Sequence, residues 1–162
     1  MPKIDVNEQL FFNLLGEKYD YSSEFEHLLS SAKAELDEAP SAAVPQDERI
    51  IKIELNDTNR PDLWSTAGLA RLLRMHTGGA SNKARYQAFL STVGERKNSG
   101  NRTITVAPAL QHIRPFMTAF VISGKPIDDA MLKDIIQTQE KLCWNFGRKR
   151  RSVSMGVYRS EL

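Results

Sequence analysis

The sequence ELNDTNRPDLWS at residues 54–65, followed by TAGLARLLR at residues 66–74, places polar and turn-forming residues between an apolar strand and an apolar helix. The side chains of residues 56–59 can each bond to nearby backbone amides. Pro61 fixes φ for a turn or for a first helical position, and Asp62 places a negative charge near the helix start. We therefore predict a tightly specified connection from strand to helix.

The elements around this connection follow from hydrophobic periodicity. Residues 50–55 are rich in β-branched side chains and predict a strand, and the helix that follows is expected to end at Gly78 and Gly79. Two further helices are expected before the strand. The first contains Leu10 to Leu15 and ends at Gly16; the second begins at a capping box at Ser23–Glu26 and continues with helical spacing from Phe25 to Leu36.

The pattern changes beyond the small, polar segment 77–83, which we interpret as a domain boundary between residues 1–78 and residues 79–162. One helix is expected there, starting at Asp128 or Asp129, burying Leu132, Ile135, Ile136, Gln139 and Leu142, and reaching at most Phe146 before Gly147. The remaining elements are expected to be strands at 86–93, 103–106, 116–122 and 152–158, with a turn at 97–101. The predicted fold class is α+β, with a small helical and strand-containing first domain followed by an incomplete mixed α+β domain.

Charge is distributed unevenly along the 162 residues, although the net charge is only +2. Residues 1–50 contain eleven Asp or Glu and four Lys or Arg, whereas residues 71–102 contain seven Lys or Arg and one Glu. Residues 141–151 contain five basic residues and no acidic one. This pattern indicates an acidic face and basic faces with different partners, or simply solvated surfaces.

Cys143 is the one cysteine, so an internal disulfide is excluded, and its apolar neighbours favour a buried structural role. Polar residues interrupt the N-terminal segment early, so no signal core is expected there. No apolar run approaches the ~18 residues that a membrane span needs. We expect a cytoplasmic protein with no membrane partner.

Two separated groups of motifs resemble one known family. Asn59-Arg60-Pro61-Asp62 leading into Gly68-Leu69-Ala70-Arg71 is similar to the first domain of the phenylalanyl-tRNA synthetase beta subunit. Further along, the start of that subunit's editing domain is resembled by Arg114-Pro115-Phe116, Gln139-Glu140-Lys141-Leu142, Arg148-Lys149-Arg150 and Met155-Gly156-Val157-Tyr158. Their order and spacing fit the archaeal/eukaryotic type, because no oligonucleotide-binding barrel interrupts the first domain.

The resemblance implies a phenylalanine–tRNA ligase, a tetramer of two alpha and two beta subunits that joins phenylalanine to tRNA(Phe) with ATP and Mg²⁺. In this family the alpha subunit carries the synthetic site, and the beta subunit's editing domain hydrolyses tRNA charged with tyrosine. The chain would be the N-terminal part of a beta subunit, with its second domain truncated. Most of the editing pocket would lie beyond Tyr158, so the resemblance assigns no catalytic residue here.

Candidate contact residues for tRNA or for another subunit are all basic. Arg60 is the residue of the polar turn that turn geometry explains least, and it can pair with Asp57 or Asp62 or reach another subunit. The second group can hold phosphate oxygens, with Trp144 and Phe146 available for base stacking; it comprises Lys141, Arg148, Lys149, Arg150 and Arg151. The alternative is that these cations complement a helix C-terminus while the aromatics belong to the core.

The sequence offers no pattern for a catalytic, cofactor or metal site of its own. Zinc spacing and a phosphate-binding glycine loop are both missing, and Gly78-Gly79 has no lysine after it. ATP and Mg²⁺ are therefore expected only with the whole enzyme. Two alternative functions stay open: a free-standing RNA-binding or aminoacyl-tRNA deacylase module, and a module that only docks subunits.

Overall fold

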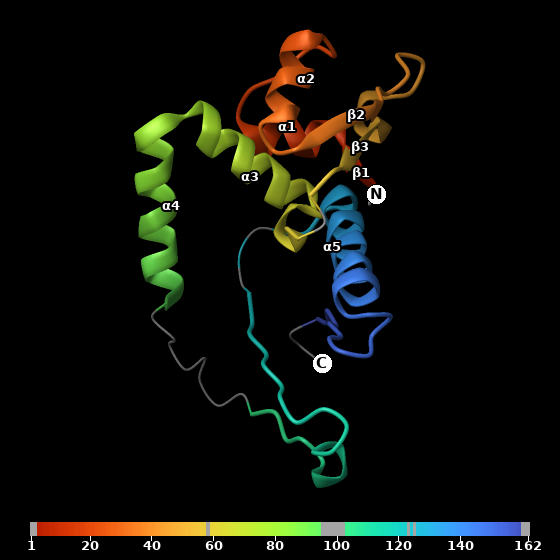
Figure 1. The fold of residues 1–162 in the computed structure, drawn as a ribbon, viewed down its shortest axis with the longest axis vertical. Coiled ribbons are helices and arrows are strands. Elements are labelled where there is room, and N and C mark those ends of the chain that lie inside the picture. The colour runs from red at the N-terminus through yellow and green to blue at the C-terminus, as the bar shows by residue number, and fades with distance from the viewer. Residues whose placement is uncertain (1–2, 58, 95–102, 123, 125, 160–162) are drawn as a thin grey trace.

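The computed structural model describes residues 3–57, 59–94, 103–122, 124 and 126–159, and it has the predicted α+β class. The first part of the chain forms a three-stranded sheet with helices packed on it (Figure 1). Its elements are β1 (Lys3–Asn7), α1 (Glu8–Leu15), α2 (Ser23–Ser30), β2 (Ala34–Glu38), the 3₁₀ turn η1 (Gln46–Glu48), β3 (Ile50–Leu55), the 3₁₀ turn η2 (Pro61–Leu63) and α3 (Thr66–Thr77).

The sheet has the order β1-β3-β2, and both pairs are antiparallel. Alternation along β3 sends Ile51, Ile53 and Leu55 into the core, opposite Val6 and Ile4 of β1. The helices cover this face with buried aromatic and aliphatic side chains, chiefly Phe11, Phe12, Phe25, Leu29, Leu69 and Leu73. The other face carries ion pairs between strands, such as Lys3 with Asp37 at 2.6 Å. One buried and one charged face explain why the register is well defined.

Gly68 in the first turn of α3 lets the polar connection pass close to the helix. A Cβ at this position would lie 1.7 Å from the backbone oxygen of Asp62, which is too close for any side chain. Ser65 is the N-cap of α3, and its hydroxyl accepts a hydrogen bond from the Gly68 amide at 3.0 Å. The predicted helix from this turn to Gly78 is confirmed.

The expected second helix is shorter than predicted, and it starts differently. Its N-cap is Ser22, which forms no side-chain capping bond, so the capping box at Ser23 is wrong. The helix ends at Ser30, the chain turns through Lys33 with φ of 53°, and Leu36 lies in β2. Apolar residues at positions 32, 34 and 36 satisfy the period of a strand as well as that of a helix, which explains the error.

The predicted strand at 86–93 is wrong, because this segment belongs to α4 (Gly79–Gly94). The helix α4 contains helix-favouring residues such as Lys83, Ala84 and Gln87, and the apolar residues of 86–93 are too few to identify a strand. The predicted turn at 97–101 lies outside the described residues.

Residues 103–122 form an extended arm that includes the 3₁₀ turn η3 (Pro108–Leu110) (Figure 1). The predicted strands at 103–106 and 116–122 form no ladder among the described residues, and neither does 152–158. The side chains of Ile104 and Val106 face those of Met117 and Ala119 across a cavity of about 270 Å³. Phe116 is 92% exposed, because extended segments without paired neighbours have no core to enter.

The helix α5 (Asp129–Lys141) joins the later part of the chain to the sheet. The Gln137 side-chain amide accepts from the Asp5 backbone N–H and donates to the Asp5 carbonyl, both at 2.8 Å. An Asp134 oxygen accepts from the backbone N–H of Thr66, the first residue of α3, at 2.9 Å. These three bonds attach α5 to the edge of β1 and to the N-terminus of α3.

The predicted Asp128 cap of α5 is confirmed, since its carboxylate accepts from the Met131 amide at 2.8 Å. The predicted burial of its apolar side is not, because no residue of α5 is fully buried and Leu132 and Ile136 are exposed.

Replacing Gly68 with Ala should lower the free energy of unfolding by about 3 kcal/mol or more, because the new methyl group meets backbone rather than a flexible side chain. Urea denaturation followed by circular dichroism measures this loss. Gly124→Ala is the matched control, since a Cβ there meets nothing within 4 Å. Equal stability of the two variants would contradict the assigned close contact.

Asp134→Ala should lower the free energy of unfolding by about 1 kcal/mol, because the first amide of α3 loses its acceptor and a nearby negative charge. Asp129→Ala on the same helix is the control: its carboxylate is 77% exposed and, among the described residues, pairs with Lys133. Denaturation curves that lose equal stability in both variants would show that Asp134 does not attach α5.

Candidate nucleic-acid interface

The polar connection between β3 and α3 bonds mostly to itself and to its neighbours. The Asn59 amide donates to Asp57 at 3.1 Å, and the Asn56 side chain donates to Glu35 at 2.5 Å. Arg60 forms a two-pronged pair with Asp62, with both N–O distances 2.9 Å. The expected pairing of Arg60 is therefore with Asp62, and its guanidinium is already held by a neighbour rather than free.

The ion pair between Arg60 and Asp62 shifts the pKa values of both residues. The hydrogen bonds from Arg60 hold the pKa of Asp62 below its ordinary value, and they raise the pKa of Arg60. Arg71 adds a weaker attraction from 3.7 Å. Both partners are more than a third exposed, so solvent screens the interaction.

The other candidate residues gather where α5 ends. The helix continues as one π-helical turn, η4 (Leu142–Phe146), which buries Cys143 and Gly147. Cys143 has the predicted structural role, since its sulfur accepts from the Met155 amide at 3.1 Å. A π-turn is rare and often lies beside a functional site.

A left-handed turn follows this π-turn and closes the helix. Arg148, Lys149 and Arg150 have φ values of 50°, 57° and 66°, a conformation that costs roughly 1–2 kcal/mol for each such residue. Their backbone amides donate to the carbonyls of Asn145, Trp144 and Cys143. We call residues 148–151 the basic turn: its backbone caps the helix, and its side chains are exposed.

Arg114 of the extended arm holds the basic turn in place. Its guanidinium donates to the carbonyl of Arg151 at 3.2 Å and also to that of Arg150. The signal for Arg114 in the sequence was its position in a family motif, and nothing in its spacing indicated that it would contact residues 36 and 37 positions later.

Exposed aromatic rings lie next to the basic turn. Trp144 is 59% exposed and Phe146 is 55% exposed, so the alternative that both belong to the core is wrong. The Lys149 ammonium lies 5.8 Å from the centre of the Trp144 ring. Cations can bind the phosphates of a nucleic acid while the exposed rings beside them stack on its bases.

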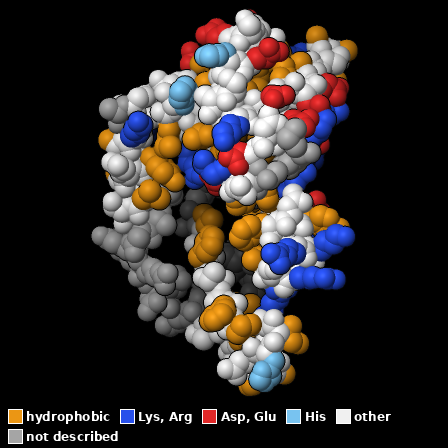
Figure 2. Space-filling view, viewed as in Figure 1, with side chains coloured by type: hydrophobic (Ala, Val, Ile, Leu, Met, Phe, Trp, Pro, Cys, Tyr) orange, Lys and Arg blue, Asp and Glu red, His pale blue; other side chains and the backbone are white. Residues whose placement is uncertain are grey.

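The structure brings four of the six candidate residues together in the basic turn, with Lys141 at the end of the same helix. Arg60 is not among them and directly precedes η2. Figure 2 shows Lys and Arg side chains gathered over the end of α5 and acidic side chains over the first part of the chain. In the parts of the chain that are described, no cluster of His, Cys, Asp or Glu could hold a metal ion, and no helix is long and apolar enough to cross a membrane.

Comparison with known proteins finds a family whose model matches the first part of the chain. Residues 1–79 match the family described as the Phe-tRNA synthetase beta subunit B1 domain. Over 99% of its length, the chain is 46% identical to a phenylalanine–tRNA ligase beta subunit of Treponema pallidum and 41% identical to one of Borreliella burgdorferi. It spans only 32% and 26% of these two relatives.

A solved structure shows the same similarity in three dimensions. It is the crystal structure of an N-terminal fragment of the phenylalanyl-tRNA synthetase beta subunit from Pyrococcus horikoshii. The alignment has a TM-score of 0.70 and 28% identity, and it covers 99% of this chain and 42% of the other. The similarity therefore extends beyond residues 1–79 to the arm, α5 and the basic turn.

Arg60→Gln should raise the pKa of Asp62 towards its ordinary value, because the largest cause of the lowering is removed. A lowered pKa in the folded state contributes stability above the unfolded pKa, and that stability is lost as pH falls through the folded value. The variant should therefore lose less stability than the parent on acidification through this range. An NMR titration of the Asp62 carboxyl measures the shift, and Arg71→Gln, which removes the more distant cation, should shift it less.

Proposed function

We propose that this chain is the N-terminal part of the beta subunit of a phenylalanine–tRNA ligase. Residues 1–79 match the B1 domain of the Phe-tRNA synthetase beta subunit, and the whole chain resembles the N-terminal part of such subunits. In this proposal the whole enzyme attaches phenylalanine to tRNA(Phe) in the cytoplasm with ATP and Mg²⁺. The chain contributes contacts to tRNA and to the alpha subunit, and it carries no catalytic residue.

The observation that supports a tRNA contact is the basic turn beside exposed rings. The backbone amides of Arg148, Lys149 and Arg150 cap the end of the helix. Their cationic side chains are exposed, and they are therefore accessible to phosphate. Arginine forks and a lysine ammonium both suit phosphate oxygens, and such contacts position RNA without reading its sequence. Arg60 is the weaker candidate, because Asp62 already occupies its guanidinium.

The proposed enzyme is an α₂β₂ tetramer of the archaeal/eukaryotic arrangement. Support for this arrangement comes from the archaeal fragment, which aligns with 99% of the chain at a TM-score of 0.70. The relatives of higher identity are bacterial, so the proposal concerns domain arrangement and not the source of the chain.

Replacing Arg148 and Lys149 together with Gln should weaken binding of tRNA(Phe) and reduce the magnitude of the slope of log K against log salt by up to about 2, roughly one for each lost phosphate contact. Filter binding across a salt series measures both quantities. The matched control is Lys83→Gln with Arg85→Gln, which removes the same charges from exposed positions on α4. Identical slopes for the two double variants would contradict a phosphate contact by the basic turn.

A free-standing RNA-binding or deacylase module is the second candidate, and the same basic turn favours it. Co-expression with the alpha subunit of the same organism distinguishes the two. A beta-subunit role predicts that tagged chain retains the alpha subunit through size-exclusion chromatography. Deacylation of tyrosine-charged tRNA(Phe) by the chain alone would instead favour the independent module.

A further inference from the structure

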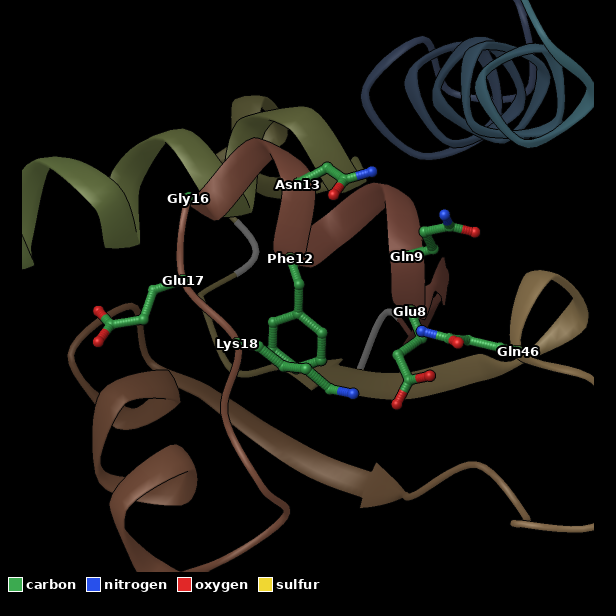
Figure 3. Close-up of a pocket in the computed structure, with 8 residues that line it drawn as sticks. All are labelled: Glu8, Gln9, Phe12, Asn13, Gly16, Glu17, Lys18 and Gln46. Atoms are coloured by element: carbon green, nitrogen blue, oxygen red, sulfur yellow. The ribbon is translucent and has the colours of Figure 1, made fainter.

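Figure 3 shows a hollow of about 450 Å³ beside α1, whose wall includes Glu8, Phe12 and Lys18. Glu8 is 3% exposed and Phe12 is 7% exposed, so both are closed to a ligand, whereas Lys18 is an exposed surface residue. The Glu8 carboxylate bonds within the fold instead, to the Tyr21 hydroxyl at 2.5 Å and to Arg49 at 3.7 Å. The hollow therefore gives no ligand site, whereas the basic turn has charged groups that are both exposed and held in place.

The basic turn is fixed from two sides. On one side, the amides of Arg148, Lys149 and Arg150 donate to carbonyls at the end of the helix, at distances between 2.8 and 3.2 Å. On the other side, the carbonyls of Arg150 and Arg151 accept from the guanidinium of Arg114. Among the described residues, these two carbonyls have no other hydrogen-bond donor. Arg114 therefore holds the side of the turn that the helix does not reach.

Arg114 is itself placed by the chain around it. It follows η3, and its backbone amide donates to the Leu110 carbonyl at 2.7 Å. Pro115 comes next, and a residue that precedes proline is biased towards extended backbone. Arg114 is half-buried, and within the described parts of the chain no carboxylate pairs with it. Its approach to a turn of like charge is therefore explained by the two carbonyls and not by attraction to a counter-ion.

The conformation of the basic turn needs such support. Its three successive residues with φ between 50° and 66° are each in a costly conformation. Repulsion among the adjacent cations of residues 148–151 adds to this cost. Without Arg114, the turn would spend part of its time in other conformations. A ligand that binds one conformation loses apparent affinity in proportion as that conformation is depopulated.

We propose that Arg114 is a positioning residue for the phosphate contact of the basic turn. It does not touch the RNA, and it keeps the side chains of Arg148 and Lys149 in the arrangement that meets the phosphates. Arginine suits this role because its planar fork donates to two acceptors at once, whereas a lysine ammonium is a point charge. This inference rests on the proposed function, because it requires that the basic turn binds tRNA.

Filter binding of tRNA(Phe) to the full chain across a salt series tests the proposal, with the variants Arg114→Gln and Arg114→Lys. Both should weaken binding about fivefold, because the binding-competent turn is less populated. The slope of log K against log salt should keep the parent's value, since no phosphate contact is removed. The matched control is Arg85→Gln, which removes an equal charge from an exposed position on α4 and should bind as the parent does.

The two variants separate positioning from charge. Parent-like binding by Arg114→Lys beside weakened binding by Arg114→Gln would overturn the proposal, because charge alone would then matter. A slope reduced by about 1 in Arg114→Gln would also overturn it, since that change marks a direct phosphate contact.

Failure of this inference is distinguishable from failure of the proposed function. If both Arg114 variants bind as the parent does while the double variant Arg148→Gln with Lys149→Gln binds weakly, the inference is wrong and the proposed function stands. If the double variant also binds as the parent does, the proposed function fails and this inference fails with it.

Amide hydrogen exchange of the free chain, followed by NMR, checks that the turn itself is loosened. In both Arg114 variants the amides of Lys149 and Arg150 should exchange faster, because their bonds to the helix end open more often. The Ile53 amide, in the central strand β3, should exchange as in the parent. Unchanged exchange at the basic turn would overturn the proposal. Faster exchange at Ile53 as well would also overturn it, because the effect would then be on the fold as a whole.

Discussion

The amide of Gln137 acts as an extra strand residue for the sheet. By accepting from and donating to the backbone of Asp5, it satisfies one position of the outer edge of β1, where a neighbouring strand would otherwise be needed. Asp134, one turn earlier, accepts from the first amide of α3. These contacts position α5, because no residue of α5 is fully buried. The placement of α5 against the sheet therefore depends on a few polar bonds, and Arg114 adds two more at the basic turn.

Local patterns in the sequence were sufficient to predict much of the structure from β1 to α3. The strand at 50–55, the helix capped by Ser65 and the glycine that ends α1 all follow from short-range chemistry. Hydrophobic periodicity was insufficient at positions 32 to 36, where the apolar residues fit both the helical and the strand period. It was also insufficient in α4, where a short apolar run was mistaken for a strand. The expected strands at 103–106 and 116–122 need neighbours from elsewhere, and periodicity within a segment carries no information about them.

The candidate interface was predictable in its composition and not in its geometry. Basic residues close to aromatic ones were visible in the sequence, and the structure places them on one helix end. Three successive left-handed residues could not be predicted from Arg148, Lys149 and Arg150, because such residues seldom adopt that conformation. The roles of Arg114, Asp134 and Gln137 are equally hidden, since each contacts a residue more than thirty positions away.

The exposed arm has a consequence for the behaviour of the chain in solution. Phe116 to Ile122 is an uncharged, proline-free run rich in aromatic and β-branched residues, and Phe116, Phe120 and Ile122 are each more than three-quarters exposed. Segments of this composition pair readily with copies of themselves when no other strand covers them. The chain should therefore self-associate through the arm as its concentration rises. The same apolar, strand-like segment would then limit the solubility of the chain.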